Sequence, residues 1–271
     1  MNKNVGKAPQ GAEGVITRGK TAQNRLRRVD IFLLLYAAEL IKQPTSAFVV
    51  DLGYGDEAVT VTEMAQRLRL LNSRLPILGV EIDPERVERA KPFSDELTQF
   101  RLGGFNLPLT RGESARIIRA YNVLRQYPED EVIPAWKTMA ESVQPGGLIV
   151  EGTSDPYGKI LTANLLRVKN DGLWYEGLLF STNFRWGFSP EIFQPVLPKN
   201  FIHRMLPGET IHQFMEDWKR ACLETVAYRQ FGLRQWFNHS AERLDSFGYS
   251  IVLQKRYLDK GCLVWRINQP V

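Results

Sequence analysis

The feature that most constrains the fold is an alternation of short apolar runs with helical patterns between residues 47 and 152. Short apolar runs bounded by turn residues are typical of strands buried on both faces of a sheet. Strand–helix–strand repeats fold as right-handed crossovers, which place the strands parallel. The sequence therefore predicts an α/β fold with helices on both faces of the sheet. The predicted strands lie at 47–51, 76–81, 99–105, 115–122 and 148–152.

Two helix starts follow the first two runs. Thr60 and Glu63 have the spacing of a capping box, in which each side chain bonds the other residue's backbone N–H. Asp83 and Pro84 supply an N-cap residue and a proline for the first helical turn. We therefore expect one helix to begin near each pair.

The C-terminal part has a different pattern. Residues 173–271 contain 18 of the 29 aromatic residues. Helical patterns dominate 157–245, and the run 173–180 is compatible with a strand. The runs 249–257 and 262–267 are separated by a short turn, which predicts an antiparallel hairpin. We therefore expect a seven-stranded, mostly parallel sheet that ends in this hairpin.

Charge and cysteine content exclude several classes of protein. Residues 1–28 carry a net charge of +6, against +5 for the whole chain, so this arm suits a polyanion or is a solvated terminus. The longest apolar run, 31–38, is far shorter than the roughly 20 residues of a membrane-spanning helix. Cys222 and Cys262 fit neither a disulfide framework nor a zinc site and favour a reducing, cytoplasmic setting.

The pattern most suggestive of a binding site follows the first run, where the sequence reads Asp-Leu-Gly-Tyr-Gly from Asp51 to Gly55. Glycines allow the backbone to approach a ligand closely, and the helix that follows offers free N–H groups. Glu81 ends the second run, where a carboxylate can accept hydrogen bonds from both hydroxyls of a ribose. Together these residues predict an adenosine-bearing cofactor at the carboxyl ends of the strands.

Charge in the loop bears on which cofactor binds. Asp56 and Glu57 place negative charge where a pyrophosphate would lie at the start of the helix. A sulfonium cofactor carries no phosphate and therefore suits this loop better. An NAD(P)-dependent oxidoreductase remains the alternative, and a non-catalytic binding protein on a related scaffold is a second one.

At these residues the sequence resembles the class I, Rossmann-like S-adenosylmethionine-dependent methyltransferases. The similarity covers roughly residues 46–155 and the closing run 249–267. It implies methyl transfer from S-adenosyl-L-methionine. Glu57 replaces the third glycine of the family's first motif. The segments that carry the resemblance are VVDLGYGDEAVT, LGVEIDPERVERAK, FRLGGFNLPL, IRAYNVLRQY and SVQPGGLIVEGT.

The resemblance also implies roles for individual residues. Asp51 would help to hold the methionine amino group, and Gly53 and Gly55 would pack against the cofactor. Glu81 would bind the ribose hydroxyls and Asn106 the adenine. The other residues expected around the cofactor are Tyr54, Ile82 and Asn122.

Three residues are candidates for the chemical step. Asn122 follows the fourth strand and would lie beside the transferred methyl group. Asp155 follows the fifth strand and is a candidate base for an acceptor that must lose a proton. His203 is a candidate on the acceptor side. Neither the three histidines nor the two cysteines have metal-ligand spacing, so no metal is expected.

These expectations divide the chain into four parts. They are a basic N-terminal arm and helix (1–45), a cofactor-binding α/β core (46–156), a helical, aromatic-rich insertion on the acceptor side (157–245) and the closing hairpin of the same sheet (246–271). The acceptor stays open: the aromatic insertion suits a small molecule, whereas the arm suits RNA or another polyanion. Arg125 and Tyr127 are candidates to contact it.

Overall fold

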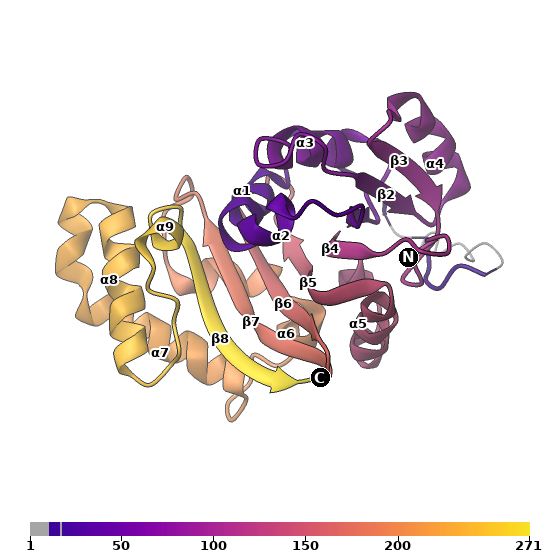
Figure 1. Ribbon diagram of the computed structural model, residues 1–271. Coiled ribbons are helices and arrows are strands. Elements are labelled where there is room, and N and C mark those ends of the chain that lie inside the picture. The colour runs from indigo at the N-terminus through magenta and orange to yellow at the C-terminus, as the bar shows by residue number, and fades with distance from the viewer. Residues whose placement is uncertain (1–10, 17) are drawn as a thin grey trace.

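The computed structural model describes residues 11–16 and 18–271, so part of the predicted basic arm lies outside the described residues. Those residues form one eight-stranded sheet in the order β3-β2-β1-β4-β5-β6-β7-β8 (Figure 1). The strands are β1 (Phe48–Leu52), β2 (Ile77–Glu81), β3 (Thr98–Leu102), β4 (Ala115–Tyr121), β5 (Val143–Ser154), β6 (Ile160–Lys169), β7 (Gly172–Thr182) and β8 (Cys262–Pro270). The α-helices are α1 (Arg27–Tyr36), α2 (Ala38–Lys42), α3 (Val59–Leu68), α4 (Pro84–Ala90), α5 (Val132–Glu141), α6 (Lys199–Ile202), α7 (Thr210–Glu224), α8 (Leu233–Ser246) and α9 (Lys255–Leu258).

The five strands β3, β2, β1, β4 and β5 are parallel, as predicted. β1 and β2 are buried along their whole length, which explains their unbroken apolar character. Leu52 lies opposite Val80 of β2 and Ala120 of β4, so these three strands end at the same level. The α/β, Rossmann-like fold with a mostly parallel sheet is therefore confirmed, and the loops after β1, β2 and β4 meet at one edge.

The antiparallel part of the sheet differs from the prediction. β5, β6, β7 and β8 form a meander, so the sheet has eight strands instead of seven. The predicted strand 249–257 is wrong: its pairing is confined to a short stretch around the bridge between Ile251 and Trp265. The Asp245 carboxylate accepts a hydrogen bond from the Ile251 N–H, and α9 begins a few residues later, so the ladder stops there. β8 pairs instead with β7, which contains the run 173–180.

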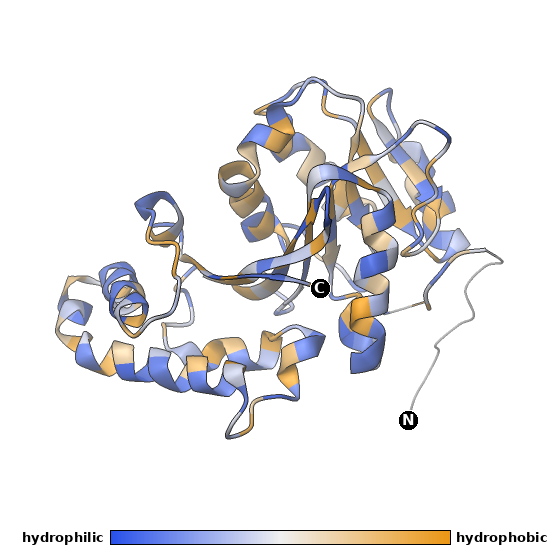
Figure 2. Cartoon of the chain, turned by 60° about the horizontal axis from the view of Figure 1, so that its bottom comes forward, coloured by the Kyte–Doolittle hydropathy of each residue, from blue (hydrophilic) through white to orange (hydrophobic). Residues whose placement is uncertain are grey.

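Three clusters of buried hydrophobic residues hold the layers together. One packs α1, α2, α3 and α9 against one face of the sheet, and a second packs α5 against the other. The third joins α7, α8 and the 3-10 segment η4 (Pro190–Val196) to β6, β7 and β8. The helices have the amphipathic pattern that this packing requires, with hydrophobic and hydrophilic residues interspersed along each ribbon in Figure 2.

The helices of the third cluster lie to the side of the parallel core, around the outer strands of the sheet (Figure 1). The first part of the segment 157–245 is not helical, because it contains β6 and β7. Within the described residues, we find no helix with the length and apolar character needed to cross a membrane.

Candidate active site

The loop between β1 and α3 takes a conformation that requires glycine. Gly53 and Gly55 have φ angles of 70° and 92°, which are unfavourable for other residues. A side chain at Gly53 would come within 2.5 Å of Val123, and one at Gly55 within 2.4 Å of the carbonyl oxygen of Gly19. The sequence predicts that a ligand comes close to both glycines. In the structure, Val123 comes close to Gly53 and the Gly19 carbonyl comes close to Gly55.

Glu81 lies buried at the end of β2 and is bonded to this loop. Its carboxylate accepts hydrogen bonds from the N–H groups of Gly55 and Ile82, both at 2.9 Å. The Arg86 guanidinium lies 3.5 Å away. Burial raises the pKa of Glu81, and these donors oppose the rise. The carboxylate expected to bind a ribose thus also fixes the position of the glycine loop.

Asp51 is paired inside the protein. Its two oxygens accept hydrogen bonds from Arg119, at 2.9 Å from Nε and 2.6 Å from Nη2, and one of them also accepts from the Thr60 hydroxyl at 2.7 Å. The predicted capping box is therefore wrong: Thr60 bonds Asp51, and the Glu63 carboxylate accepts from the N–H of Asn24. The Asp51 carboxylate has little capacity left for a methionine amino group.

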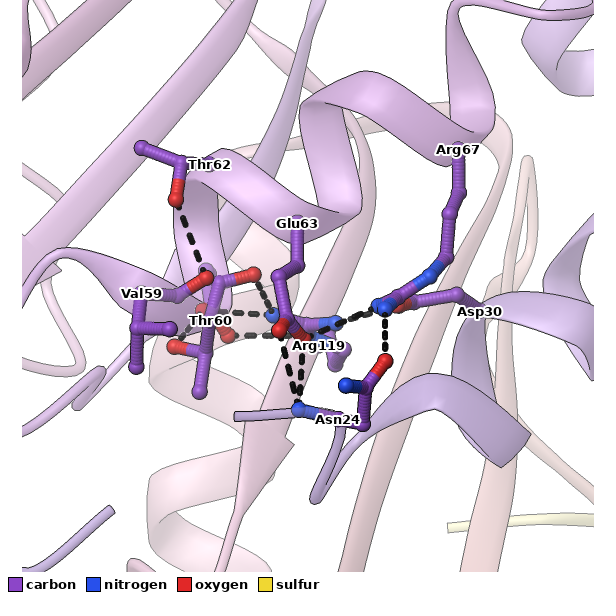
Figure 3. Close-up of polar contacts among 9 residues, drawn as sticks. Asn24, Asp30, Val59, Thr60, Thr62, Glu63, Arg67 and Arg119 are labelled. Carbon is purple, nitrogen blue, oxygen red and sulfur yellow. Dashed lines mark hydrogen bonds and ion pairs between the residues drawn. The ribbon is translucent and has the colours of Figure 1, made fainter. Parts of the chain in front are cut away.

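Arg119 is the centre of a buried ion network (Figure 3). Besides Asp51, it binds the Asp30 carboxylate and the carbonyl oxygen of Thr60. Burial alone would lower the pKa of Arg119, but the carboxylates of Asp51 and Asp30 outweigh burial and raise it. Arg67 extends the network from Asp30 to Asn24. The network therefore joins the N-terminal arm and α1 to the strands of the site.

A cavity of about 830 Å³ opens at the carboxyl ends of β1, β4 and β5. It lies against the glycine loop. The structure brings six of the predicted site residues to its lining, which are Asp51, Gly53, Tyr54, Gly55, Asn122 and Asp155. The segment 157–245 contributes Trp186, Pro195 and Val196 to the same cavity.

Asn122 has the backbone strain often found at functional sites. Its φ angle is 62°, in the left-handed region that a non-glycine residue rarely adopts. Its side-chain amide holds Ser154, accepting from the N–H at 3.0 Å and donating to the hydroxyl at 3.2 Å. The side chain thus joins the end of β4 to the end of β5 at the cavity wall.

Asp155, predicted as a base, organises a turn. Its carboxylate accepts hydrogen bonds from the N–H groups of Tyr157, Lys159 and Ile160, at 2.6 to 2.9 Å. These bonds stabilise the loop between β5 and β6 and occupy most of the hydrogen-bond acceptor sites of the carboxylate.

The N-terminal arm forms a wall of the cavity. This position was not predicted from the sequence. Arg18, Lys20 and Arg25 belong to its lining. The Gly19 carbonyl accepts a hydrogen bond from the Asp56 N–H at 2.8 Å, which fixes this part of the arm to the glycine loop. Arg25 donates to the hydroxyl of Ser154 and to backbone carbonyl oxygens, all neutral acceptors. The one sequence feature that could have indicated this position is the concentration of basic residues in the arm.

Residues 11–16, which we call the strap, lie in the place expected for the nucleoside. Asn106 binds them through both amide atoms: Oδ1 accepts from the Glu13 N–H and Nδ2 donates to the Gly11 carbonyl, both at 2.7 Å. The Phe105 N–H donates to the Glu13 carbonyl at 2.9 Å. The Tyr127 hydroxyl accepts from the Val15 N–H at 2.6 Å. The amide expected to bind adenine is thus bonded to the strap.

A small pocket of about 20 Å³ remains beneath the strap. Glu81, Ile82, Phe105 and Tyr127 line it, together with strap residues. This volume holds about one water molecule. A nucleoside therefore fits between Glu81 and Asn106 only when the strap moves away.

The third predicted catalytic residue is not near either pocket. His203 is exposed at the end of α6, and its Nε2 lies 3.3 Å from Nζ of Lys199. It lines neither cavity. In the part of the chain that the structure describes, no group of histidine, cysteine, aspartate or glutamate side chains has a metal-binding arrangement.

Comparison with known proteins gives structural neighbours of low sequence identity. No family model matches the chain, and no curated protein matches its sequence. The plantazolicin methyltransferase BpumL superposes with a TM-score of 0.38 at 11% identity, covering 48% of this chain and 46% of its own. Human N-acetylserotonin methyltransferase superposes with a TM-score of 0.32 at 23% identity, covering 47% of this chain and 37% of its own. The TehB-like SAM-dependent methyltransferase of Corynebacterium glutamicum superposes with a TM-score of 0.34 at 19% identity, covering 49% of this chain and 64% of its own. The chain thus spans less than two thirds of the length of each.

Proposed function

We propose that the chain is an S-adenosylmethionine-dependent methyltransferase. The observation that carries the proposal is the large cavity beside a glycine loop whose Gly55 is bonded to a buried carboxylate, Glu81. Glycine loops of this kind bring the backbone close to a ligand, and a carboxylate at the end of the second strand suits a ribose.

The residues of the site fit such a cofactor in two parts. Arg25 and Asn122 line the large cavity, where Arg25 suits the methionine carboxylate because its present partners are neutral oxygens. Glu81 suits the ribose, and Ile82 and Phe105 provide apolar walls for the base once the strap has moved. When bound, the sulfonium supplies an electrophilic methyl group. The chain contributes positioning of the acceptor and exclusion of water, which lower the barrier by reducing the entropy lost in the reaction.

A nicotinamide dinucleotide has less support. Its pyrophosphate would lie at the start of α3, where the Gly19 carbonyl packs against Gly55 and accepts from the Asp56 N–H. The Asp56 carboxylate lies at the same place but is paired with Arg86 at 2.9 Å. The Gly19 carbonyl is therefore the feature that opposes an anion there. A non-catalytic binding protein would bind the cofactor without transferring the methyl group, so detection of transfer separates it from the proposal.

Calorimetric titration of the full chain with S-adenosylhomocysteine, and separately with NAD, tests the proposal. We expect binding of the first and none of the second. Glu81→Gln should weaken binding about tenfold, because a neutral amide replaces a charged acceptor for the ribose hydroxyls but keeps an acceptor for the Gly55 N–H.

The matched control is Glu176→Gln, which makes the same change in a surface ion pair with Arg167. This variant should bind S-adenosylhomocysteine as the wild type does. Equal affinity of the Glu81→Gln variant and the wild type would remove Glu81 from the site, and tight binding of NAD would replace the proposed function with the oxidoreductase.

A further inference from the structure

The outer part of the large cavity is rich in cations. Arg18, Lys20, Arg25 and Arg125 all belong to its lining. Among the residues that the structure describes, no carboxylate forms an ion pair with any of the four. Arg125 donates to the Pro195 carbonyl, and Arg25 donates only to neutral oxygens. This contrasts with Arg119, which lies between two carboxylates.

The carboxylates of the cavity offset only part of this charge. Asp51 is paired with Arg119. Asp155 is bonded to three backbone N–H groups, and its carboxylate opposes the fall that burial causes in the pKa of Arg25, so it acts on that one cation. Under the proposed function, the cofactor makes the imbalance larger: its sulfonium and ammonium groups are positive, and its single carboxylate occupies one cation. A neutral or cationic acceptor would leave at least three cations near the sulfonium without a counter-charge.

Among the described residues that line the cavity, both carboxylates are already bonded: Asp51 to Arg119 and Thr60, and Asp155 to three backbone N–H groups. No histidine, cysteine or glutamate lines the cavity within the described part of the chain. The Tyr121 hydroxyl is buried, and burial raises the pKa of Tyr121 well above its usual value, so the hydroxyl stays protonated. An acceptor that is already deprotonated needs no base.

From these observations, and resting on the proposed function, we infer that the acceptor is a small molecule with an anionic oxygen, which Arg18, Lys20 and Arg125 bind and which receives the methyl group directly. The oxygen forms a bond to the methyl carbon as the carbon–sulfur bond breaks. The electron pair of that bond goes to sulfur, which becomes a neutral thioether, and no proton is transferred. The shared chemistry is an oxyanion, either carboxylate or phosphate.

The surroundings favour a small acceptor over a nucleic acid. The cations face a cavity of about 830 Å³ that Trp186, Pro195 and Val196 also line. Trp186 is 47% exposed, so part of its indole is available to an apolar or aromatic portion of the acceptor. An anionic group joined to a ring therefore matches both the charge and the wall of the cavity.

Three probes that share a phenyl ring test the inference. Benzoate, phenyl phosphate and the neutral benzamide are titrated into the complex with S-adenosylhomocysteine at constant ionic strength. We expect saturable binding of benzoate or phenyl phosphate, whichever carries the preferred oxyanion, and none of benzamide. The paired substitution Arg18→Gln with Arg125→Gln should weaken anion binding about tenfold or more.

The control removes two exposed arginines outside the cavity, through Arg111→Gln with Arg234→Gln, and makes the same change in net charge. It should leave anion affinity within about twofold of the wild type, because distant exposed charges are screened by salt. Equal weakening in both paired variants, equal binding of benzamide, or no binding of either anion would overturn the inference. Binding of polyuridylate without binding of either small anion would overturn it in favour of a nucleic-acid acceptor.

The same titrations separate this inference from the proposed function. Normal binding of S-adenosylhomocysteine without binding of either anion overturns the anionic acceptor alone. If S-adenosylhomocysteine does not bind the wild-type chain, the proposed function fails, and the inference fails with it.

Discussion

Arg119 shows how one residue can determine the geometry of the site. It is fully buried between Asp30 and Asp51, which belong to α1 and β1. Removing a buried cation leaves its carboxylate partners desolvated and unpaired, which costs far more than removing an exposed pair. The run ARIIRAY contains Arg116 and Arg119 among apolar residues, and no local pattern in it identifies the carboxylates that pair with Arg119.

We predict that Arg119→Met lowers the free energy of unfolding by about 3–5 kcal/mol, measured by urea denaturation. The control is Arg167→Met, which breaks the partly exposed pair with Glu176 and should cost less than about 1 kcal/mol. A similar loss in the two variants would show that the buried network contributes no more than a surface pair.

Glu151 gives a second residue-scale prediction, on pH. It is buried in β5, with Asn164 donating to one oxygen at 2.7 Å, and burial raises the pKa of Glu151 from 4.5 to about 7. Because the folded protein holds this proton more tightly than the unfolded chain, the stabilisation is complete below pH 4.5. This stabilisation, which amounts to about 3 kcal/mol, is lost as the pH rises to about 7.

The comparison is between the wild type and Glu151→Gln, whose amide cannot ionise. We expect the free energy of unfolding of the wild type to fall relative to that of the variant between pH 4.5 and 7, and the difference to stay constant above that range. A constant difference throughout the range would mean that Glu151 is not protonated in the folded protein.

At the scale of elements, the strap covers the pocket that we propose for the nucleoside. Its hydrogen bonds to Asn106, Phe105 and Tyr127 close the pocket above Glu81. A ligand can enter only from an open state, so its apparent association rate is reduced by the fraction of molecules that are closed.

Two truncations isolate this effect. Deletion of residues 2–16 removes the strap, whereas deletion of residues 2–10 keeps it and removes the same two lysines, Lys3 and Lys7. We predict that S-adenosylhomocysteine associates about tenfold faster with the shorter chain, measured by stopped-flow fluorescence. Equal rates for the two truncations would mean that the strap does not limit entry.

Helices and strands were predictable where the local sequence pattern matched the packing of that segment in the fold. Asp83 caps α4 as expected, accepting from the Glu85 N–H at 2.9 Å, and the five parallel strands follow their apolar runs. β6 escaped prediction, although the turn before Gly172 separates two apolar runs in the manner of a hairpin. The predicted strand 249–257 is wrong for the opposite reason: its apolar residues pack into the first and third clusters without forming a ladder.

At the scale of the whole molecule, the site was predictable only in part. The loop from Gly53 to Gly55 and Glu81 depend on local sequence and the ends of neighbouring strands, so the sequence was sufficient to place them together. Arg18, Arg25 and Trp186 reach the cavity from segments far apart in the chain. Their positions depend on how the arm and the insertion fold over the sheet, which no local pattern encodes.

The far edge of the sheet bears on the behaviour of the protein at high concentration. β8 has β7 on one side, and residues around Ile251 cover only part of the other. An open edge is a template for pairing with another molecule, but this one ends in exposed polar residues and Pro270, which has no N–H to donate. The β8 edge is therefore protected against edge-to-edge aggregation by its own sequence.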